Sequence, residues 1–428
     1  MDNAVYQLTF LVTFAAISLA AVKRTATSAE DFAVANRSLS ARGVFWVIIG
    51  TLVGGVSTIG TVQTAYTHGI SAGIFTFGSG LSCLLLGCFF ARALREEGVV
   101  TISEYLGRFF GQRFRYYCSF INSLGMFIHV VGQFLAAIAI LQAVFHFGDS
   151  ASVLITLGLL AVFVMCGGIS GAGLIGKIKF FMLYAIMVIS AVVAINAGGG
   201  LERILADLPE DMNMLGFTQY GLKTATIDLL SMIVGVLSTQ IYLQAIFAAK
   251  DVREARNGAF LSAAVIPPIG IMGIIIGLFL RANHPEVAAN PAQALPYFLQ
   301  VFFSPVVAAL FSAGLLLIVL GTGTGLVLGV TTNIYNDFLN SERWRKSVQP
   351  LRMVRFITLA VLLLASMLVF TGLDSTILRW SYLSMGLRGS SVFAGLVVLV
   401  FLRRTADNAM VRGLLYLLPV VYVLVNFL

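Results

Sequence analysis

The chain has 428 residues, of which 59% are hydrophobic and only 11% are charged. An ordinary soluble domain carries about a quarter charged residues, so this composition excludes that class of protein. The net charge of +8 does not indicate nucleic-acid binding, because the basic residues lie in short segments between long apolar runs, as in proteins of the lipid bilayer.

Apolar runs recur along the whole chain, each near the roughly 20 residues that span a bilayer as a helix. A β-barrel is disfavoured, because barrel strands alternate over about ten residues and these runs are continuously apolar. We therefore predict one all-α integral membrane domain over residues 1–428. Its approximately twelve transmembrane helices are expected at 4–22, 44–67, 72–94, 116–145, 151–169, 175–197, 225–249, 258–281, 304–336, 351–371, 376–402 and 409–427.

Lysine and arginine are concentrated in every second loop, and Lys177 and Lys179 count among these basic loop residues. Basic loops stay in the cytoplasm, so both termini are predicted to face away from it, in the cell (inner) membrane. The first basic pair, Lys23 and Arg24, follows the first apolar run, so that run is expected to remain as an uncleaved span.

Two predicted spans contain helix-breaking residues at membrane depth. One has glycines at positions 50, 54, 55 and 60, and the other contains Gly235. Each span opens a set of five helices, which predicts two repeats at about 44–197 and 225–404, with one extra helix at each end. Matched interruptions in two halves predict a transporter binding site. The alternative is that these glycines only allow close packing of helices.

The span 116–145 carries Asn122, Met126, His129 and Gln133 at helical spacing, which places them on one face. One interpretation of this polar face is an interhelical hydrogen bond. His129 has a further interpretation as a proton carrier, because histidine titrates near neutral pH.

Arg388 lies near the middle of the span 376–402, where an arginine costs about 3 kcal/mol on insertion scales. We expect it to face a cavity or a partner, for which Asp228 is a candidate. We consider three roles for Arg388. Its guanidinium could take the place of a bound cation, bind an anionic solute, or donate hydrogen bonds to backbone carbonyls where a helix is unwound.

Several strings resemble the sodium/solute symporter family, whose fold is of the LeuT type. They are DFAVANRSL at 31–39, STIG at 57–60, TISEYL at 101–106, Gly167-Gly168, AAKD at 248–251 and TNIY at 332–335. The resemblance implies a LeuT-type 5+5 inverted repeat. It also implies secondary active transport of a small polar solute by alternating access, coupled to sodium or protons.

The resemblance also implies a site. Substrate contacts are expected from Ser57 and Thr58, which follow the first interruption, and from His129, Gln133 and Gly235 around one central cavity. The alternative for Ser57 and Thr58 is a hydrogen bond to the preceding turn.

In this fold a sodium ion lies between carbonyls of the first broken helix, here Gly50 and Val53, and hydroxyls of the span 304–336. An ungapped alignment places Leu317 and Ile318 there, which cannot ligate a hard cation. That alignment predicts transport that does not depend on sodium, with Arg388 or His129 supplying the positive charge in place of the ion. A shift of one turn places Thr322 there and predicts sodium dependence. We prefer the ungapped alignment, because a deletion in a packed helix forces its neighbours to repack.

No arrangement of residues indicates an enzyme, and no cofactor other than sodium is implied. A solute sensor or a non-transporting membrane scaffold with a degenerate ion site remains the alternative function.

Overall fold

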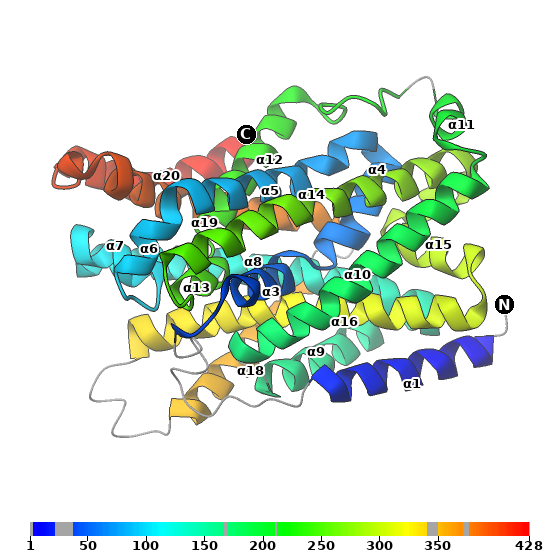
Figure 1. Ribbon diagram of the computed structural model, residues 1–428, viewed down its shortest axis with the longest axis horizontal. Coiled ribbons are helices and arrows are strands. Elements are labelled where there is room, and N and C mark those ends of the chain that lie inside the picture. Colours follow the sequence, from blue (N-terminus) through cyan, green and yellow to red (C-terminus); the bar gives the residue numbers. More distant parts are fainter. Residues whose placement is uncertain are drawn as a thin grey trace.

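All regular secondary structure in the described part of the chain is helical (Figure 1). The computed structural model describes residues 3–21, 37–166, 169–209, 212–339, 350–370 and 376–427. Within these residues nine helical segments are long and apolar enough to cross a membrane, and three shorter apolar helices accompany them. The predicted all-α class is confirmed, whereas the number of crossings stays a prediction. Residues 31–36 and Gly167-Gly168 of the family-like strings lie outside the described residues.

The helices lie close to the predicted spans, with one predicted span divided at each interruption. Their bounds are α1 (Asn3–Ala21), α3 (Ala41–Leu52), α4 (Thr61–His68), α5 (Gly73–Leu85), α6 (Ala91–Glu96), α7 (Ile102–Phe110), α8 (Gln112–Phe145), α9 (Asp149–Cys166), α10 (Ile169–Ala197), α11 (Leu201–Ala206), α12 (Leu222–Val236), α13 (Gln240–Phe247), α14 (Val252–Asn283), α15 (Ala294–Phe302), α16 (Pro305–Asn333), α18 (Pro350–Val369), α19 (Ile377–Phe401) and α20 (Ala409–Phe427).

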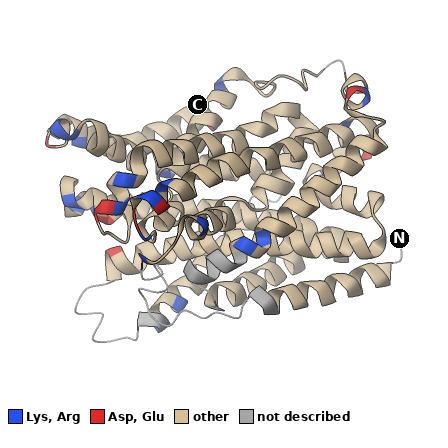
Figure 2. Cartoon of the chain, viewed as in Figure 1, with Lys and Arg blue, Asp and Glu red and all other residues tan. Residues whose placement is uncertain are grey.

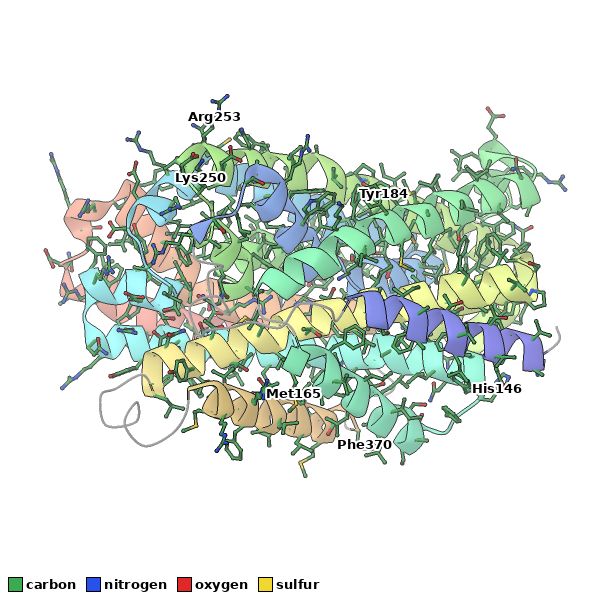
Figure 3. All side chains as sticks on the ribbon, turned by 60° about the horizontal axis from the view of Figure 1, so that its bottom comes forward. His146, Met165, Tyr184, Lys250, Arg253 and Phe370 are labelled. Carbon is green, nitrogen blue, oxygen red and sulfur yellow. The ribbon has the colours of Figure 1, made fainter. Side chains whose placement is uncertain are left out.

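Two helices form the centre of the bundle. In both α8 and α16, 83% of the most apolar stretch of 18 residues is buried, compared with 11% of the corresponding stretch in α20. Helix α19 packs along α8 and α12, while α1 packs along α16 (Figure 1). Side chains fill the spaces between the ribbons, and Lys250 and Arg253 lie toward the opposite end of the bundle from His146 (Figure 3).

The outer surface is apolar between two charged ends. Leu8, Met367 and Met410 are 65%, 70% and 75% exposed, and Figure 2 shows that charged residues gather mainly toward the ends of the bundle. A soluble monomer rarely exposes such extended apolar surface. This surface is therefore suited to contact with lipid chains.

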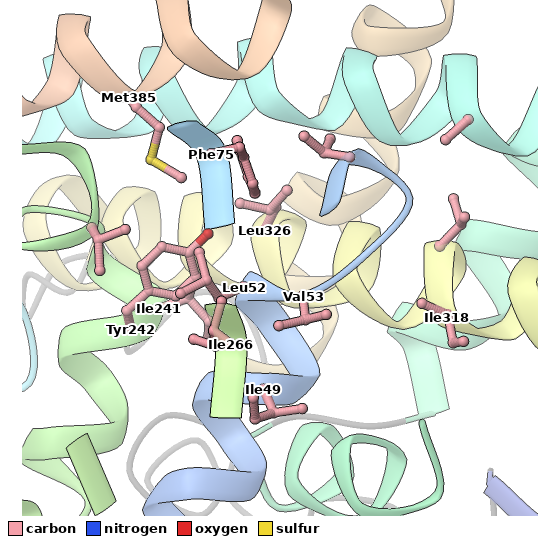
Figure 4. Packing of buried hydrophobic residues seen from close by; sticks show 14 of the residues in the cluster. Ile49, Leu52, Val53, Phe75, Ile241, Tyr242, Ile266, Ile318, Leu326 and Met385 are labelled. Carbon is pink, nitrogen blue, oxygen red and sulfur yellow. The ribbon is translucent and has the colours of Figure 1, made fainter. Parts of the chain in front are cut away.

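Both predicted helix interruptions are present. Helix α3 ends at Leu52, Val53 is extended with φ −90° and ψ 112°, and the chain resumes as a π-helical turn, η2 (Val56–Gly60). The second interruption lies at residues 237–239, between α12 and α13. Figure 4 shows the end of α3 packed among buried apolar side chains, which include Phe75, Ile241 and Leu326.

Close packing explains why glycines lie at these positions. A Cβ atom on Gly54 would lie 2.2 Å from the hydroxyl oxygen of Thr322, and one on Gly235 would lie 2.4 Å from the Cβ of Met385. Side chains at either position would push the broken helix away from its neighbour.

Candidate functional site

The predicted polar face of α8 lies inside the bundle. Asn122 and His129 are fully buried, and Gln133 is 1% exposed. Because α8 packs against both α16 and α19, these side chains lie between the helices that form the centre of the molecule.

Two of these side chains reach the two helix interruptions. The backbone N–H of Gly55 donates to Gln133 Oε1 over 3.1 Å. At the other interruption, the Asn122 amide donates to the carbonyl of Ser238, and its Oδ1 accepts from the N–H of Gln240 over 3.4 Å. Helix α8 therefore satisfies backbone groups that each interruption leaves without helical partners.

Arg388 is fully buried and bonds to α8. Its Nη1 donates to Ser384 Oγ over 3.0 Å, and its Nη2 donates to His129 Nδ1 over 3.3 Å. A guanidinium has no acceptor, so Nδ1 of His129 must accept, and the neutral imidazole carries its proton on Nε2. The suggested pairing with Asp228 is not what the structure shows, since that residue lines an outer cavity.

Three buried donor atoms in this region have no partner among the described residues. They are His129 Nε2, Gln133 Nε2 and Arg388 Nε. Leaving a buried donor unsatisfied costs about 1–3 kcal/mol, and more for a charged group. Within the described part of the chain, Arg388 also has no carboxylate partner. A ligand with acceptor oxygens would satisfy these three donors.

The hydroxyls after the first interruption bond to nearby backbone. Ser57 Oγ donates to the carbonyl of Gly54 over 3.0 Å, and Thr58 Oγ1 donates to the same carbonyl over 2.9 Å. This is the alternative that the sequence left open for both residues. Gly235 packs on Met385, whose sulfur accepts from Arg388.

The residues predicted to bind an ion lie together. Thr322 Oγ1 donates to the carbonyl of Val53 over 3.0 Å. The structure thus brings Thr322, the residue of the alignment shifted by one turn, to the interrupted backbone, within the continuous helix α16 (Pro305–Asn333). The assignment of these residues as sodium ligands stays a prediction.

A residue that the sequence analysis assigned to a loop completes this cluster. Lys179 Nζ donates to the carbonyl of Gly50 over 2.8 Å and to Thr322 Oγ1. Lys179 is fully buried, whereas Lys177 is exposed. Arg388, one of two candidates for the replacement cation, contacts His129 instead. The signal that could have found Lys179 is its place inside the predicted span 175–197.

Two cavities lie near the end of the bundle that holds α15. One of about 370 Å³ is lined in part by His68, Tyr220, Asp228 and Arg379. The other, of about 280 Å³, is lined in part by Gln142 and Asn290. Neither is lined by Ser57, His129 or Gln133, so the central cavity predicted around those residues stays a prediction.

Comparison with known proteins identifies similar chains. Residues 32–416 match the model of the Sodium:solute symporter family. A high-affinity choline transporter 1 from Drosophila melanogaster is 23% identical over 67% of this chain, which spans 48% of that relative. A sodium/glucose cotransporter from Vibrio parahaemolyticus is 22% identical over 75% of this chain and 65% of the relative.

Among solved structures, a Na+-coupled sialic acid symporter in a substrate-bound outward-open state superposes with a TM-score of 0.78. The two chains are 15% identical, and the match covers 99% of this chain and 98% of that one. At this identity the likeness shows the fold alone, and it confirms the expected LeuT-type architecture.

Proposed function

Because the chain belongs to the sodium:solute symporter family, we propose that it is a secondary active transporter, which moves a small polar solute across the bilayer by alternating access. The two helix interruptions support this proposal, since interrupted helices in corresponding places form the binding sites of such transporters. We further propose that residues 44–197 and 225–404 are the two inverted repeats, each opened by one interrupted helix.

The single observation that carries the choice of solute is the group of three buried donors without a partner around Arg388. His129, Gln133 and Arg388 each leave an N–H without a partner in the described part of the chain, so they suit a solute with acceptor oxygens, above all a carboxylate. A quaternary ammonium such as choline offers a single hydroxyl oxygen as an acceptor, and the buried guanidinium would repel its positive charge. The solute is therefore an anion or a neutral, oxygen-rich molecule.

We also propose the orientation predicted from the loops, with both termini outside the cytoplasm. Most lysine and arginine residues in the described part of the chain lie toward one end of the bundle (Figure 2), and a basic end is retained in the cytoplasm. Labelling of single cysteines from outside intact cells tests this proposal. Labelling at position 253 would reverse the orientation, whereas labelling at position 146 is the expected result.

The solute class is tested by thermal unfolding of the purified protein with matched solutes, each carboxylate paired with its amide and its amine analogue. A carboxylate is expected to raise the unfolding temperature of the wild type, and the amine is not. In Arg388→Gln this effect should disappear, while Arg92→Gln, a change at an exposed arginine, should behave as the wild type. Stabilisation by amines alone would contradict the proposed solute class.

Uptake into proteoliposomes then tests transport itself. Solutes that stabilise the protein should accumulate inside vesicles that contain the wild type but not in those that contain Arg388→Gln. Binding without any uptake or exchange would show that the protein does not transport.

A further inference from the structure

The family name makes sodium the expected coupling ion, so the fit of the cluster at the first interruption to that ion matters. A hard cation binds through oxygen ligands, typically six or more in proteins for calcium. The oxygens available here are the carbonyls of Gly50 and Val53, at the end of α3, and the hydroxyl of Thr322 on α16, which lies against them.

All three oxygens are already engaged by protein groups. The carbonyl of Gly50 and the hydroxyl of Thr322 each accept a hydrogen bond from the Lys179 ammonium, and that hydroxyl donates to the carbonyl of Val53. The Thr322 hydroxyl contacts the interrupted backbone directly, with 3.0 Å between its oxygen and the Val53 carbonyl. Each of the three oxygens is therefore held by a protein hydrogen bond that a sodium ion would have to displace.

The path of α10 makes this arrangement possible. A Cβ atom on Gly176 would lie 1.9 Å from the carbonyl of Trp46 and 3.1 Å from the Cα of Gly50. Only glycine permits α10 to approach α3 this closely. Lys179 lies three residues later, on the same face of α10, so its side chain reaches the end of α3 within one turn.

In the described part of the chain, no carboxylate balances the charge of Lys179. Among the described residues no Asp or Glu oxygen lies within 4.0 Å of its Nζ, although the side chain is fully buried. Burying an ammonium is costly unless hydrogen bonds compensate. The carbonyls at the C-terminal end of α3 lack helical partners at the interruption. They lie at the negative end of the helix dipole, which favours a cation.

We propose that the Lys179 ammonium takes the place of the sodium ion, so that this member of the family holds its α3–α16 contact with a tethered cation and does not use sodium at this site. The replacement of sodium at this site can be tested without knowing whether the protein transports a solute. Only the consequence for transport, independence from sodium at this site, rests on the proposed function. An ammonium and a sodium ion carry the same charge, and both are held by oxygens. A second cation beside Lys179 would be repelled by it.

The proposal is tested first on the wild-type protein, by binding of radioactive sodium and by thermal unfolding in sodium chloride against choline chloride at equal ionic strength. Neither measurement needs a known solute. We expect no saturable sodium binding and a difference in unfolding temperature below about 1 °C, whereas a bound ion at a hundred times its dissociation constant would raise that temperature by about 3 °C. Saturable sodium binding by the wild type that persists in Thr322→Ala would place a sodium site elsewhere, and binding that is lost in that variant would overturn the proposal.

The second test removes the ammonium. Lys179→Ala should unfold at a temperature about 5 °C lower in choline chloride, and sodium or ethylammonium should recover most of the loss by entering the vacated space. Lys177→Ala, on the exposed face of the same helix, should match the wild type in every buffer. A Lys179→Ala protein that unfolds at the wild-type temperature, or that responds to no added cation, would also overturn the proposal. If Lys179→Ala cannot be purified, the wild-type measurements decide alone.

Solute binding separates this proposal from the proposed function. A solute that stabilises the wild type equally in both salts agrees with both. A solute that binds only in sodium, with a sodium dependence that is lost in Thr322→Ala, contradicts the tethered cation and leaves transport intact. If no solute of any class binds, transport is contradicted, and the sodium measurements still decide the role of Lys179.

Discussion

Arg115 and Asp337 form an ion pair that closes one end of the bundle between α8 and α16. Arg115 Nη2 lies 2.8 Å from Asp337 Oδ1, and Arg115 Nε donates to the same oxygen over 2.9 Å. The side chain of Asp337 is fully buried and that of Arg115 is 23% exposed. Asp337 belongs to η7 (Ile334–Leu339) at the end of α16, and its Oδ1 also accepts from Thr101. The pair therefore joins three elements at the basic end.

Replacing this carboxylate should loosen that end of the protein. Asp337→Asn is expected to lower the free energy of unfolding by about 2 kcal/mol. This loss is smaller than that for a fully buried ion pair, because Arg115 is partly exposed. Unfolding in denaturant measures the loss. Asp407→Asn is the control, since Asp407 is 95% exposed in its pair with Arg412 and should cost at most about 0.5 kcal/mol.

Local opening at the same end can be followed at Cys118, which is buried on α8. The measurement uses a protein in which Cys83, Cys88 and Cys166 are replaced by alanine. In that background Asp337→Asn should raise the rate of Cys118 alkylation about tenfold, because destabilising the closed state by about 1.4 kcal/mol relative to the open state raises the open fraction tenfold. An unchanged rate would show that the ion pair does not hold this end closed.

Contact between Gly54 and Thr322 predicts a steric effect. Gly54→Ala should destabilise the protein by about 1–3 kcal/mol, because the added carbon meets the threonine side chain. Adding Thr322→Ala should recover part of this loss, which a double-mutant cycle measures. Gly158→Ala, where an added carbon meets nothing within 4 Å, should be neutral or stabilising. Strict additivity of Gly54→Ala and Thr322→Ala would contradict the contact.

Gln133 has a structural and a binding role, which two substitutions separate. Gln133→Leu removes the acceptor of the Gly55 N–H and should cost about 1–3 kcal/mol of stability. Gln133→Glu keeps an acceptor oxygen for Gly55, so it should retain more stability than Gln133→Leu while binding a carboxylate solute at least tenfold more weakly. Equal solute binding by Gln133→Glu and the wild type would remove Gln133 from the proposed site.

A loop outside the spanning helices carries a pH-dependent contact. Hydrogen bonds from Tyr297 and then His284 lower the pKa of Glu286 from 4.5 to about 2. A lowered carboxyl pKa contributes stability that is present above pH 4.5 and is lost as the pH falls toward 2. The stability difference between wild type and Tyr297→Phe should therefore be constant from pH 5 to 7 and shrink below about pH 4.5. A difference that grows on acidification would contradict this assignment.

The pattern of glycines and polar residues predicted much of the site because both act locally. Gly54, Gly55 and Gly235 marked the interruptions, because they lie at corresponding places in two halves of the chain, which is typical of interrupted helices at a transporter binding site. Helical spacing placed His129 and Gln133 on one face, because that depends only on residues within two turns. These inferences needed no knowledge of which helices are neighbours.

Partners across helices could not be predicted in the same way. Asp228 was the candidate partner of Arg388 because it is acidic, but the guanidinium meets a histidine from α8. Lys179 was read as a loop cation because a lysine at the edge of an apolar run usually extends to the interface. Its burial depends on the close approach of α10 to α3 at Gly176, and that is a property of the assembled bundle.

The ammonium of Lys179 is bonded to the chain, which bears on the electrical work of transport. A free ion carried with the solute leaves on the far side, so each cycle moves its charge through the membrane potential, at about 2.3 kcal/mol per charge for each 100 mV. A lysine returns with the empty carrier, and its charge movement sums to zero over the cycle. At this site the potential can then act only on the charge of the solute, so an anionic solute in a cell with a negative interior would need a second coupled ion, such as a proton, or exchange for another solute.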